Sequence, residues 1–555
     1  MHVETALEAV TARLGRFHWV VCSLLCSAYV YQALFNMSFV FTTMRSEHRC
    51  LIPECETADS LADMDPPWLP SAVPAGPRED TCRRYAPLSS GGQARCDGQG
   101  WSNMTVACDR WVYPNKDLSI MTEWDMVCSP SAEWQLTLVG TLSNMGRALG
   151  LPLFGLVSDA LGRRMALLTG LAVSCVLGLA RSFAPNYIAF ISLEFVDPIF
   201  YDGIGGAAFI MGMELVPTAS RGAWSAISHV IFALGLALLG VVAWLLPRWR
   251  LLLRVVYGSA LLCLAALWFV PESVRWLASK GRTEEAFRVI NKAAKMNRLP
   301  LVSTKQQTKD GTGHVGWGDG LSPAEQDRRD SPRPASFAED MRDFARSRTL
   351  MLRLIVSCFS WVAIMFVYDG LAVYSVSLAG SRYLNFVLVE LVEVPAALLT
   401  WWLMSAAGRR RTLVGSLILA AACCVAYHFL PAATDAADTP WARTAAVMLA
   451  KLFVTLAFTC TYVLSAELFP TRVRHTLYSL CATCGRLFGS ALSPQMPLLG
   501  AVMESLPLLV SGAACFLCGL LSLILPETAR SPLPDTVQEA EAIGRKDLPK
   551  RTDRA

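Results

Sequence analysis

Charged residues are scarce in this sequence. Asp, Glu, Lys and Arg together make up 17% of its 555 residues, whereas hydrophobic residues make up 53%. A water-soluble core cannot absorb so much apolar surface, but a lipid bilayer can. The net charge is only +4, and the basic residues are scattered at the ends of apolar segments instead of forming one stripe, which argues against nucleic-acid binding. The composition therefore predicts a membrane protein.

Motifs of several enzyme classes are also missing. The sequence has no GxxxxGK[ST] loop for ATP, no HExxH motif, and no two CxxC motifs at the spacing of a zinc site. It also has no recognisable constellation for nucleophilic or acid–base catalysis. We therefore expect a protein that is not an enzyme, that holds no metal and that needs no cofactor.

Long apolar runs, in contrast, are abundant. A hydrocarbon core of about 30 Å requires about 20 apolar residues in a helix. The first run, Phe17 to Met44, contains no Asp, Glu, Lys or Arg and is too long for a signal peptide. Twelve spans are predicted, at about 17–44, 134–157, 166–183, 188–212, 223–246, 251–270, 351–378, 383–405, 412–431, 442–466, 475–498 and 505–525.

Three short charged motifs occur twice in the same order. The pairs are Glu214–Arg221 with Glu467–Arg474, Gly162–Arg164 with Gly408–Arg410, and Pro271–Arg275 with Pro526–Arg530. The second copies follow the first by 246 to 255 residues, so the chain contains two copies of one unit in the same direction. In so apolar a chain, this indicates a transporter built from two parallel halves of six helices around a central cavity.

Arg and Lys in the short loops lie mainly on one side of the alternating spans, which we assign to the cytoplasm. Both termini are then cytoplasmic, and the plasma membrane is the expected location. The predicted domains are a cytoplasmic N-terminus (1–16), a first half (17–271), a cytoplasmic linker (272–350), a second half (351–526) and a cytoplasmic tail (527–555). In the linker we expect a short amphipathic helix at 284–295 and disorder at 303–336.

A long insertion at 45–132 falls on the opposite, exported side. It contains six cysteines, and an even number in an exported loop favours up to three disulfides whose pairing remains open. Asn103 begins an Asn-Met-Thr glycosylation acceptor in the same loop. The candidate disulfide cysteines are Cys50, Cys55, Cys82, Cys96, Cys108 and Cys128.

Several segments resemble solute carrier family 22, the organic cation/anion transporters of the major facilitator superfamily. The resemblance covers almost the whole chain and rests on the residues Leu14–Phe17, Phe35–Ser38, Glu47–Cys50, Thr122–Cys128, Pro271–Leu277 (PESVRWL), Asn385–Phe386 and Val392–Ala396. It implies the major facilitator fold and a small organic ion as substrate, with a counter-transported ion as a possible second partner and the lipid bilayer as surroundings. Oligomeric state is not predicted.

The resemblance also implies site residues. In the second half, charges and aromatic rings match positions that line the family's cavity, and Lys451 and Arg486 match basic positions of its anion-transporting branch, so anions are favoured. One residue more than the family usually has lies between Arg486 and Pro494. The candidate substrate residues are Asn36, Tyr368, Glu393, Lys451, Phe458, Tyr462 and Arg486.

The repeated motifs are expected at the cytoplasmic helix ends, where carboxylates and guanidiniums of the two halves can pair when the transporter faces outward and separate when it opens inward. Simple interfacial anchoring is the alternative. The predicted cytoplasmic gate comprises Asp159, Arg163, Arg164, Glu214, Arg221, Glu272, Arg275, Arg409, Arg410, Glu467, Arg474, Glu527 and Arg530.

The chain departs from the family in its fourth span and in one repeat. Glu194 replaces an Arg, and Asp197 and Asp202 follow where the family is apolar and rich in glycine. Ser405 stands where the second repeat should have the equivalent of Asp159. Acids inside a membrane helix are costly and require partners, a water-filled cavity or a weakened span, and Arg147 in the second span is the candidate partner.

Two functions remain open at this stage. The first is secondary-active or facilitative transport of small organic ions by alternating access, with anions favoured. The second is a receptor or regulatory membrane protein that keeps the fold but no longer transports. The departures in the fourth span motivate the second.

Overall fold

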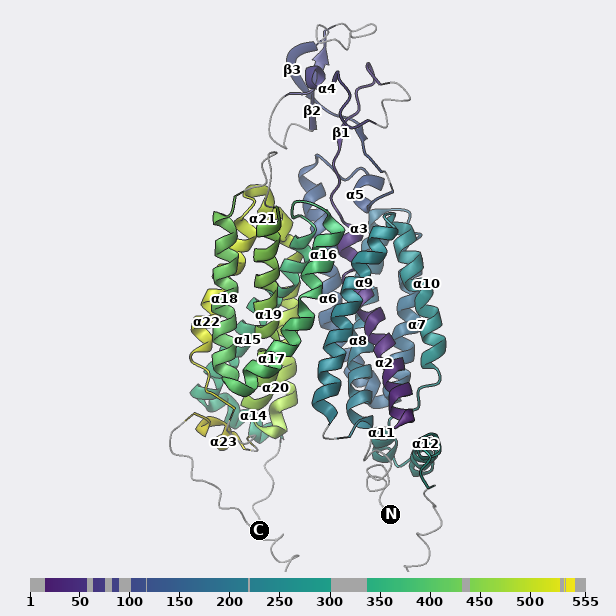
Figure 1. Cartoon of the computed structure of the whole chain (residues 1–555), viewed down its shortest axis with the longest axis vertical. Coiled ribbons are helices and arrows are strands. Elements are labelled where there is room, and N and C mark those ends of the chain that lie inside the picture. The colour runs from purple at the N-terminus through teal and green to yellow at the C-terminus, as the bar shows by residue number, and fades with distance from the viewer. Residues whose placement is uncertain are drawn as a thin grey trace, which may run out of the picture.

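The computed structural model describes residues 15–56, 63–74, 82–88, 101–115, 117–217, 220–300, 337–431, 440–529, 534 and 536–544. Its helices form two bundles that stand side by side, one from each half of the sequence (Figure 1). A small domain with strands projects from one end, which we call the loop end. The opposite end, where the repeated charged motifs lie, we call the box end. The predicted all-α membrane fold is confirmed.

The first bundle contains α2 (Arg16–Asn36), α3 (Ser38–Thr42), α6 (Pro130–Leu161), α7 (Arg163–Arg181), α8 (Tyr187–Leu215), α9 (Arg221–Leu245) and α10 (Trp249–Leu267). The second contains α15 (Arg348–Ser375), α16 (Arg382–Leu391), α17 (Glu393–Ala406), α18 (Arg409–Phe429), α19 (Pro440–Leu468), α20 (Thr471–Cys484), a π-helical turn (Gly485–Ser490), a 3₁₀ turn (Ser493–Gln495), α21 (Met496–Val502) and α22 (Leu506–Ser522). Shorter helices lie outside the bundles: α4 (Leu69–Ala72), α5 (Ile120–Glu123), α11 (Val274–Ser279), α12 (Thr283–Met296), α14 (Phe337–Arg346) and α23 (Val537–Ala542).

In the described part of the chain, eight helices are long and apolar enough to cross a membrane. The other predicted spans correspond to α6, α8, the segment from α20 to α21, and α22, which pack in the same two bundles. This arrangement is consistent with the predicted twelve spans. The amphipathic helix expected in the linker is α12, whereas residues 303–336 lie outside the described residues.

Polar residues set where several bundle helices begin. The side chains of Ser129, Asn186, Ser347 and Ser381 accept hydrogen bonds from backbone N–H groups in the first turns of α6, α8, α15 and α16. Such caps satisfy donors that have no partner within the helix. They fix the helix ends next to the loops, so that the apolar residues between them occupy the membrane.

The loop domain consists of two antiparallel strand pairs. β1 (Arg49–Cys50) pairs with β4 (Trp111–Val112), and β2 (Arg83–Pro87) pairs with β3 (Trp101–Ala107), in which Thr105 lies opposite Tyr85. Disulfides join Cys50 to Cys108 and Cys82 to Cys128. Cys55 is also disulfide-bonded, whereas Cys96 lies outside the described residues. Asn103 is exposed on β3, where a glycan would be accessible.

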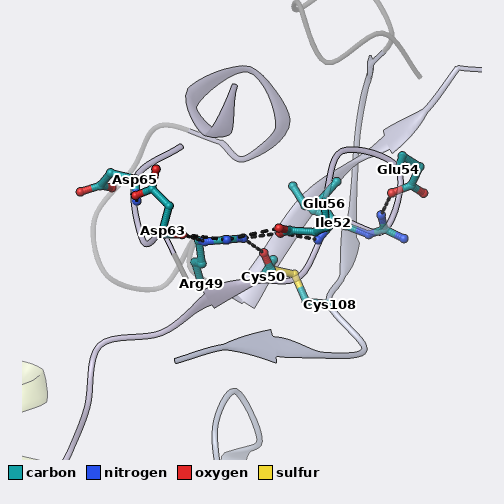
Figure 2. Close-up of polar contacts among 9 residues, drawn as sticks. Arg49, Cys50, Ile52, Glu54, Glu56, Asp63, Asp65 and Cys108 are labelled. Atoms are coloured by element: carbon teal, nitrogen blue, oxygen red, sulfur yellow. Dashed lines mark hydrogen bonds and ion pairs between the residues drawn. A yellow bond between two sulfur atoms is a disulfide. The ribbon is translucent and has the colours of Figure 1, made fainter. Parts of the chain in front are cut away.

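A buried ion pair organises this domain (Figure 2). The Arg49 guanidinium donates to the Glu56 carboxylate at 2.5 Å and to the backbone carbonyl of Asp63 at 2.8 and 3.0 Å. It also lies over the Trp68 ring, 5.6 Å from its centroid. Because the side chains of Arg49 and Glu56 are only 5% and 7% exposed, neither charge has water as an alternative partner.

We predict that Arg49→Ala destabilises the loop domain by about 3–5 kcal/mol, because it breaks the buried ion pair with the Glu56 carboxylate. Limited proteolysis of the purified full chain should then cut within residues 45–128 at a much lower protease concentration. Arg83→Ala is the control, since the Arg83 side chain is exposed and contacts only Thr105 Oγ1 among the described side chains. Equal protease resistance of Arg49→Ala and wild type would contradict the prediction.

Candidate substrate site

The two bundles meet along a seam where α9 packs against α16 and α17, and where α6 packs against α20, the π-helical turn Gly485–Ser490, the 3₁₀ turn and α21. Polar contacts across the seam lie toward the loop end: Thr137 with Gln495, Thr141 with the carbonyl of Ala491, and Asn144 with the carbonyl of Ser490. Rings from both halves also pack there, with Phe41 and Phe386 centroids 5.0 Å apart. The halves are therefore held together mainly on the side of the loop domain.

Among the described residues, two ion pairs cross this seam, with one Arg and one Asp from each half. Arg147 on α6 pairs with Asp369 on α15, with Nη2 and Oδ2 3.3 Å apart. Arg486 in the π-helical turn pairs with Asp202 on α8, with Nη1 and Oδ1 2.5 Å apart. Arg147 also donates to the side-chain oxygen of Asn36, at the end of α2. We call these four charged residues the seam quartet.

A second charged cluster lies inside the second half. The Lys451 ammonium on α19 is 3.4 Å from a Glu390 oxygen and 3.0 Å from a Glu393 oxygen. It lies 3.7 Å from the centroid of the Tyr368 ring, in cation–π contact. Lys451 is fully buried, so its charge is neutralised by residues of its own half.

Aromatic rings connect this cluster to the seam quartet. Tyr368 stacks on Phe458 with centroids 4.8 Å apart, and Phe458 lies 4.8 Å from Tyr462. Trp361 lies 4.5 Å from Tyr462 and extends the row. The structure thus brings together the predicted substrate residues Tyr368, Glu393, Lys451, Phe458, Tyr462 and Arg486. Asn36 joins them because its side chain accepts a hydrogen bond from Arg147. An apolar hollow lined by residues of α2, α9 and α10, including Tyr31 and Leu238, contains none of them.

The expected partner of the acids in the fourth span is wrong. Glu194 and Asp197 on α8 both form ion pairs with Arg181 at the end of α7. Asp197 also accepts a hydrogen bond from the Tyr257 hydroxyl at 2.6 Å. Asp202 pairs with Arg486, while Arg147 turns to Asp369 instead. Among the described residues, Arg486 does not pair with Glu390 or Glu393, because those acids contact Lys451.

Sequence reasoning missed Arg181, which lies near the end of the predicted span 166–183. The side chain is 1% exposed and sits over the Tyr257 ring, 5.3 Å from its centroid. A signal was available in the short connection from Arg181 to Tyr187, since it makes α7 and α8 an antiparallel hairpin. A long side chain at the end of one helix can then reach an acid in the first turns of the next.

The extra residue between Arg486 and Pro494 has a structural counterpart in the π-helical turn Gly485–Ser490. A π-helical turn accommodates one additional residue without ending the helix and changes the direction of the side chains around it. Close backbone contact holds the turn against α15, because a Cβ atom at Gly489 would lie 2.3 Å from the Val362 carbonyl oxygen. Arg486 is thereby presented to α8.

At the box end, the repeated motifs form one clasp in each half. In the first half, the Arg163 guanidinium lies 2.9 Å from Asp159 and 3.8 Å from Glu214, and Glu272 accepts from the backbone N–H of Arg164 at 3.1 Å. The hydroxyl of Ser273 closes the group by donating to Glu214. These contacts tie the start of α7 to the ends of α8 and α10.

The second half repeats this clasp. Arg409 lies 3.3 Å from Glu467, and Glu527 accepts from the backbone N–H groups of Arg409 and Arg410 at 2.9 and 3.1 Å. The hydroxyl of Thr528 donates to Glu467 at 2.5 Å. Within the described residues, none of these side chains pairs with the other half, so the expected contacts across the halves are not formed in this conformation.

The remaining gate residues also stay within their own halves. Arg164 and Arg410 donate to the carbonyls of Trp268 and Leu525, which lie just after the ends of α10 and α22. Arg275 is exposed, and Arg474 donates to the carbonyls of Phe469 and Pro534. The side chain of Arg221 and the whole of Arg530 lie outside the described residues.

Comparison with known proteins supports the resemblance to transporters. The profile of the "Sugar (and other) transporter" family matches residues 100–539. The "Organic cation/carnitine transporter 2" of Homo sapiens is 31% identical over 551 residues, covering 96% of this chain and 93% of that protein. The chain belongs to solute carrier family 22. Like the other members of the major facilitator superfamily, it is a multi-pass membrane transporter.

Other similarities extend over the same length. The "Organic cation transporter protein" of Drosophila melanogaster is 29% identical over 97% of this chain and 94% of that protein, and "Solute carrier family 22 member 3" of Mus musculus is 29% identical over 96% and 95%. The partially occluded, inward-open xylose transporter XylE of E. coli aligns over 93% of this chain and 100% of that chain with a TM-score of 0.58 at 14% identity. That structural likeness shows the major facilitator fold.

We predict that Asp202→Asn and Arg486→Gln each lower the thermal stability of the purified protein, because breaking a buried ion pair leaves one charge without a partner and costs about 3–5 kcal/mol. The double variant should lose less than the sum of the two single losses. Additive losses would show that the two side chains do not interact.

We also predict that Gly408→Ala destabilises the second clasp. Gly408 has φ +91° and ψ 171°, a region that is almost exclusive to glycine, and a Cβ atom there would lie 2.7 Å from a Glu527 oxygen. The backbone strain alone should cost about 1–3 kcal/mol. Gly415→Ala on the same helix is the matched control, since its Cβ would meet no atom within 4 Å. Thermal unfolding of both variants checks this, and equal melting temperatures would contradict it.

Proposed function

We propose that this transporter carries small organic cations, including cations that also bear a carboxylate, by alternating access around the seam quartet and the adjoining aromatic row. The observation that carries the proposal is the charge balance of the site. The two charged clusters contain three basic residues (Arg147, Lys451 and Arg486) and four acidic residues (Asp202, Asp369, Glu390 and Glu393).

The sequence-based preference for anions rested on Lys451 and Arg486 alone. Both bases face buried carboxylates, so neither offers an uncompensated positive charge to an anion. If all seven groups are ionised, the set carries a net charge of −1, which favours a cation. Aromatic rings such as those of Phe458 and Tyr462 suit an organic cation for the same reason that Tyr368 suits Lys451. Names of the compared relatives also refer to organic cations and carnitine.

Buried polar atoms at the seam support a ligand that bears both charges. One Asp202 oxygen (Oδ2) and the Arg147 Nε atom are buried without a hydrogen-bond partner among the described residues. Unpaired buried polar groups are costly and mark places where a ligand or water would be stabilised. A cationic group near Asp202 and a carboxylate near Arg147 would satisfy both atoms.

The alternative, a receptor that no longer transports, loses its main support. The unusual acids of α8 have partners in Arg181, Tyr257 and Arg486, so they do not indicate a damaged helix. The missing acid at Ser405 also matters little. Its counterpart Asp159 is 73% exposed, and exposed ion pairs contribute only about 0–1 kcal/mol.

We further propose that the loop end faces outward at the plasma membrane and that both termini are cytoplasmic. Disulfides such as Cys50–Cys108 persist in an oxidising compartment, which supports this orientation. Contacts between the halves concentrate at the loop end while the clasps stay within each half, which supports a cytoplasm-facing conformation. A counter-transported ion remains a prediction.

Uptake of radiolabelled tetraethylammonium and carnitine into cells expressing the full chain tests the proposal. We expect saturable uptake of at least one of these probes and less uptake of benzoate, an organic anion. Glu393→Gln should reduce uptake about tenfold or more, because the substrate cation would lose a charged partner. The loss of a hydrogen bond to a charged group costs about 1.5–3 kcal/mol. This variant is suitable because Lys451 keeps Glu390 at 3.4 Å as a partner.

Glu47→Gln is the matched control, since Glu47 is an exposed acid in the loop domain. Surface biotinylation must show equal amounts of wild type and both variants. Preferential uptake of benzoate would contradict the proposed substrate class. Uptake of no probe by protein that reaches the surface would favour the receptor alternative.

A further inference from the structure

Three cysteines meet beside the π-helical turn, outside the site described above. Cys358 lies on α15, and Cys481 and Cys484 lie on α20. The sulfurs of Cys358 and Cys481 are 3.5 Å apart, and Cys484 also contacts Cys358. All three are free thiols, so this group has no structural disulfide role in the conformation described.

We propose that Cys358 and Cys481 form a reversible disulfide that arrests the transporter under oxidation. Cys358 is partly exposed and Cys481 is buried, so the first thiol can meet an oxidant and the second can resolve it. The proposed oxidant is a peroxide, such as hydrogen peroxide. It converts the Cys358 thiolate to a sulfenic acid with release of hydroxide, and the Cys481 thiol then attacks that sulfur and releases water. In sum, two thiols and one peroxide give one disulfide and two waters.

Geometry decides which disulfide matters. Cys481 and Cys484 are three residues apart on α20, so a bond between them would lie within one helix and constrain nothing else. A bond from Cys358 to either of them joins α15 to α20. Only a small approach is required, because the sulfur–sulfur distance of 3.5 Å must shorten to about 2.05 Å.

The consequence follows from what lies next to the thiols. The π-helical turn begins directly after Cys484, and Gly485 lies so close to α15 that a Cβ atom would be 3.1 Å from the Trp361 carbonyl oxygen. Arg486, the next residue, pairs with Asp202 across the seam. A disulfide at Cys358 would fix α15 to α20 immediately before the π-helical turn, whose Arg486 contacts the first half. The arrest requires that α15 and α20 shift against each other beside this turn when the transporter changes conformation, and the disulfide would prevent that shift.

The decisive experiment is chemical and needs no transport. The purified full chain is treated with hydrogen peroxide, digested and analysed by mass spectrometry. We expect linked peptides that contain Cys358 with Cys481 or Cys484, and their loss after dithiothreitol. Oxidation without any link from Cys358 would overturn the proposal, even if uptake were inhibited.

The functional consequence rests on the proposed function and is measured separately. Peroxide should abolish most tetraethylammonium or carnitine uptake by wild type, and dithiothreitol should restore it. Cys358→Ala and, as a second variant, Cys358→Ser should resist peroxide, whereas Cys423→Ala, another partly exposed thiol of the same half, should remain sensitive. Equal inhibition of Cys358→Ala and wild type would refute the arrest. Absence of uptake by the reduced protein would refute the proposed function and leave the peptide result to decide the disulfide.

Discussion

The arrangement of the seam depends on one constraint, the cost of an unpaired charge inside a membrane. A carboxylate far from water must find a cation, a hydrogen-bond donor or a ligand. Asp202 finds Arg486 and Asp369 finds Arg147, and both pairs join residues from different halves. The halves therefore cannot separate at the seam unless other partners replace these contacts. A ligand that carries charge is one such partner, and this links the stability of the closed seam to the chemistry of transport.

The box end obeys a different rule. There the acids Glu272 and Glu527 accept from backbone N–H groups at the starts of α7 and α18, where a helix favours negative charge. These clasps are local and repeated, so each makes its own half stiffer without tying it to the other. Box ends that are stiff and not tied to each other can move apart while the halves stay joined toward the loop end, as alternating access requires.

Much of the fold could be predicted from the sequence because it is local. Apolar runs located the spans. The repeated motifs predicted a gate across the halves, whereas their charged groups pair within each half in this conformation. Partner choice was less accessible. Whether Arg147 faces Asp202 or Asp369 depends on the rotation of α6 and α15 about their axes, which no local pattern records. Arg181 was missed because its position at a helix end suggested exposure, whereas its long side chain reaches inward to Glu194.

Two departures from the family that looked separate in sequence are parts of one feature. An extra residue after Arg486 would shift every later side chain of the helix if the α-helical repeat simply continued. The π-helical turn confines that extra residue to Gly485–Ser490 and presents Arg486 to α8. The unusual acid Asp202 lies at the position that Arg486 reaches. In this conformation Asp202 and Arg486 compensate each other's charge at the seam. Their combination keeps the seam compensated while placing a positive and a negative group side by side between the halves.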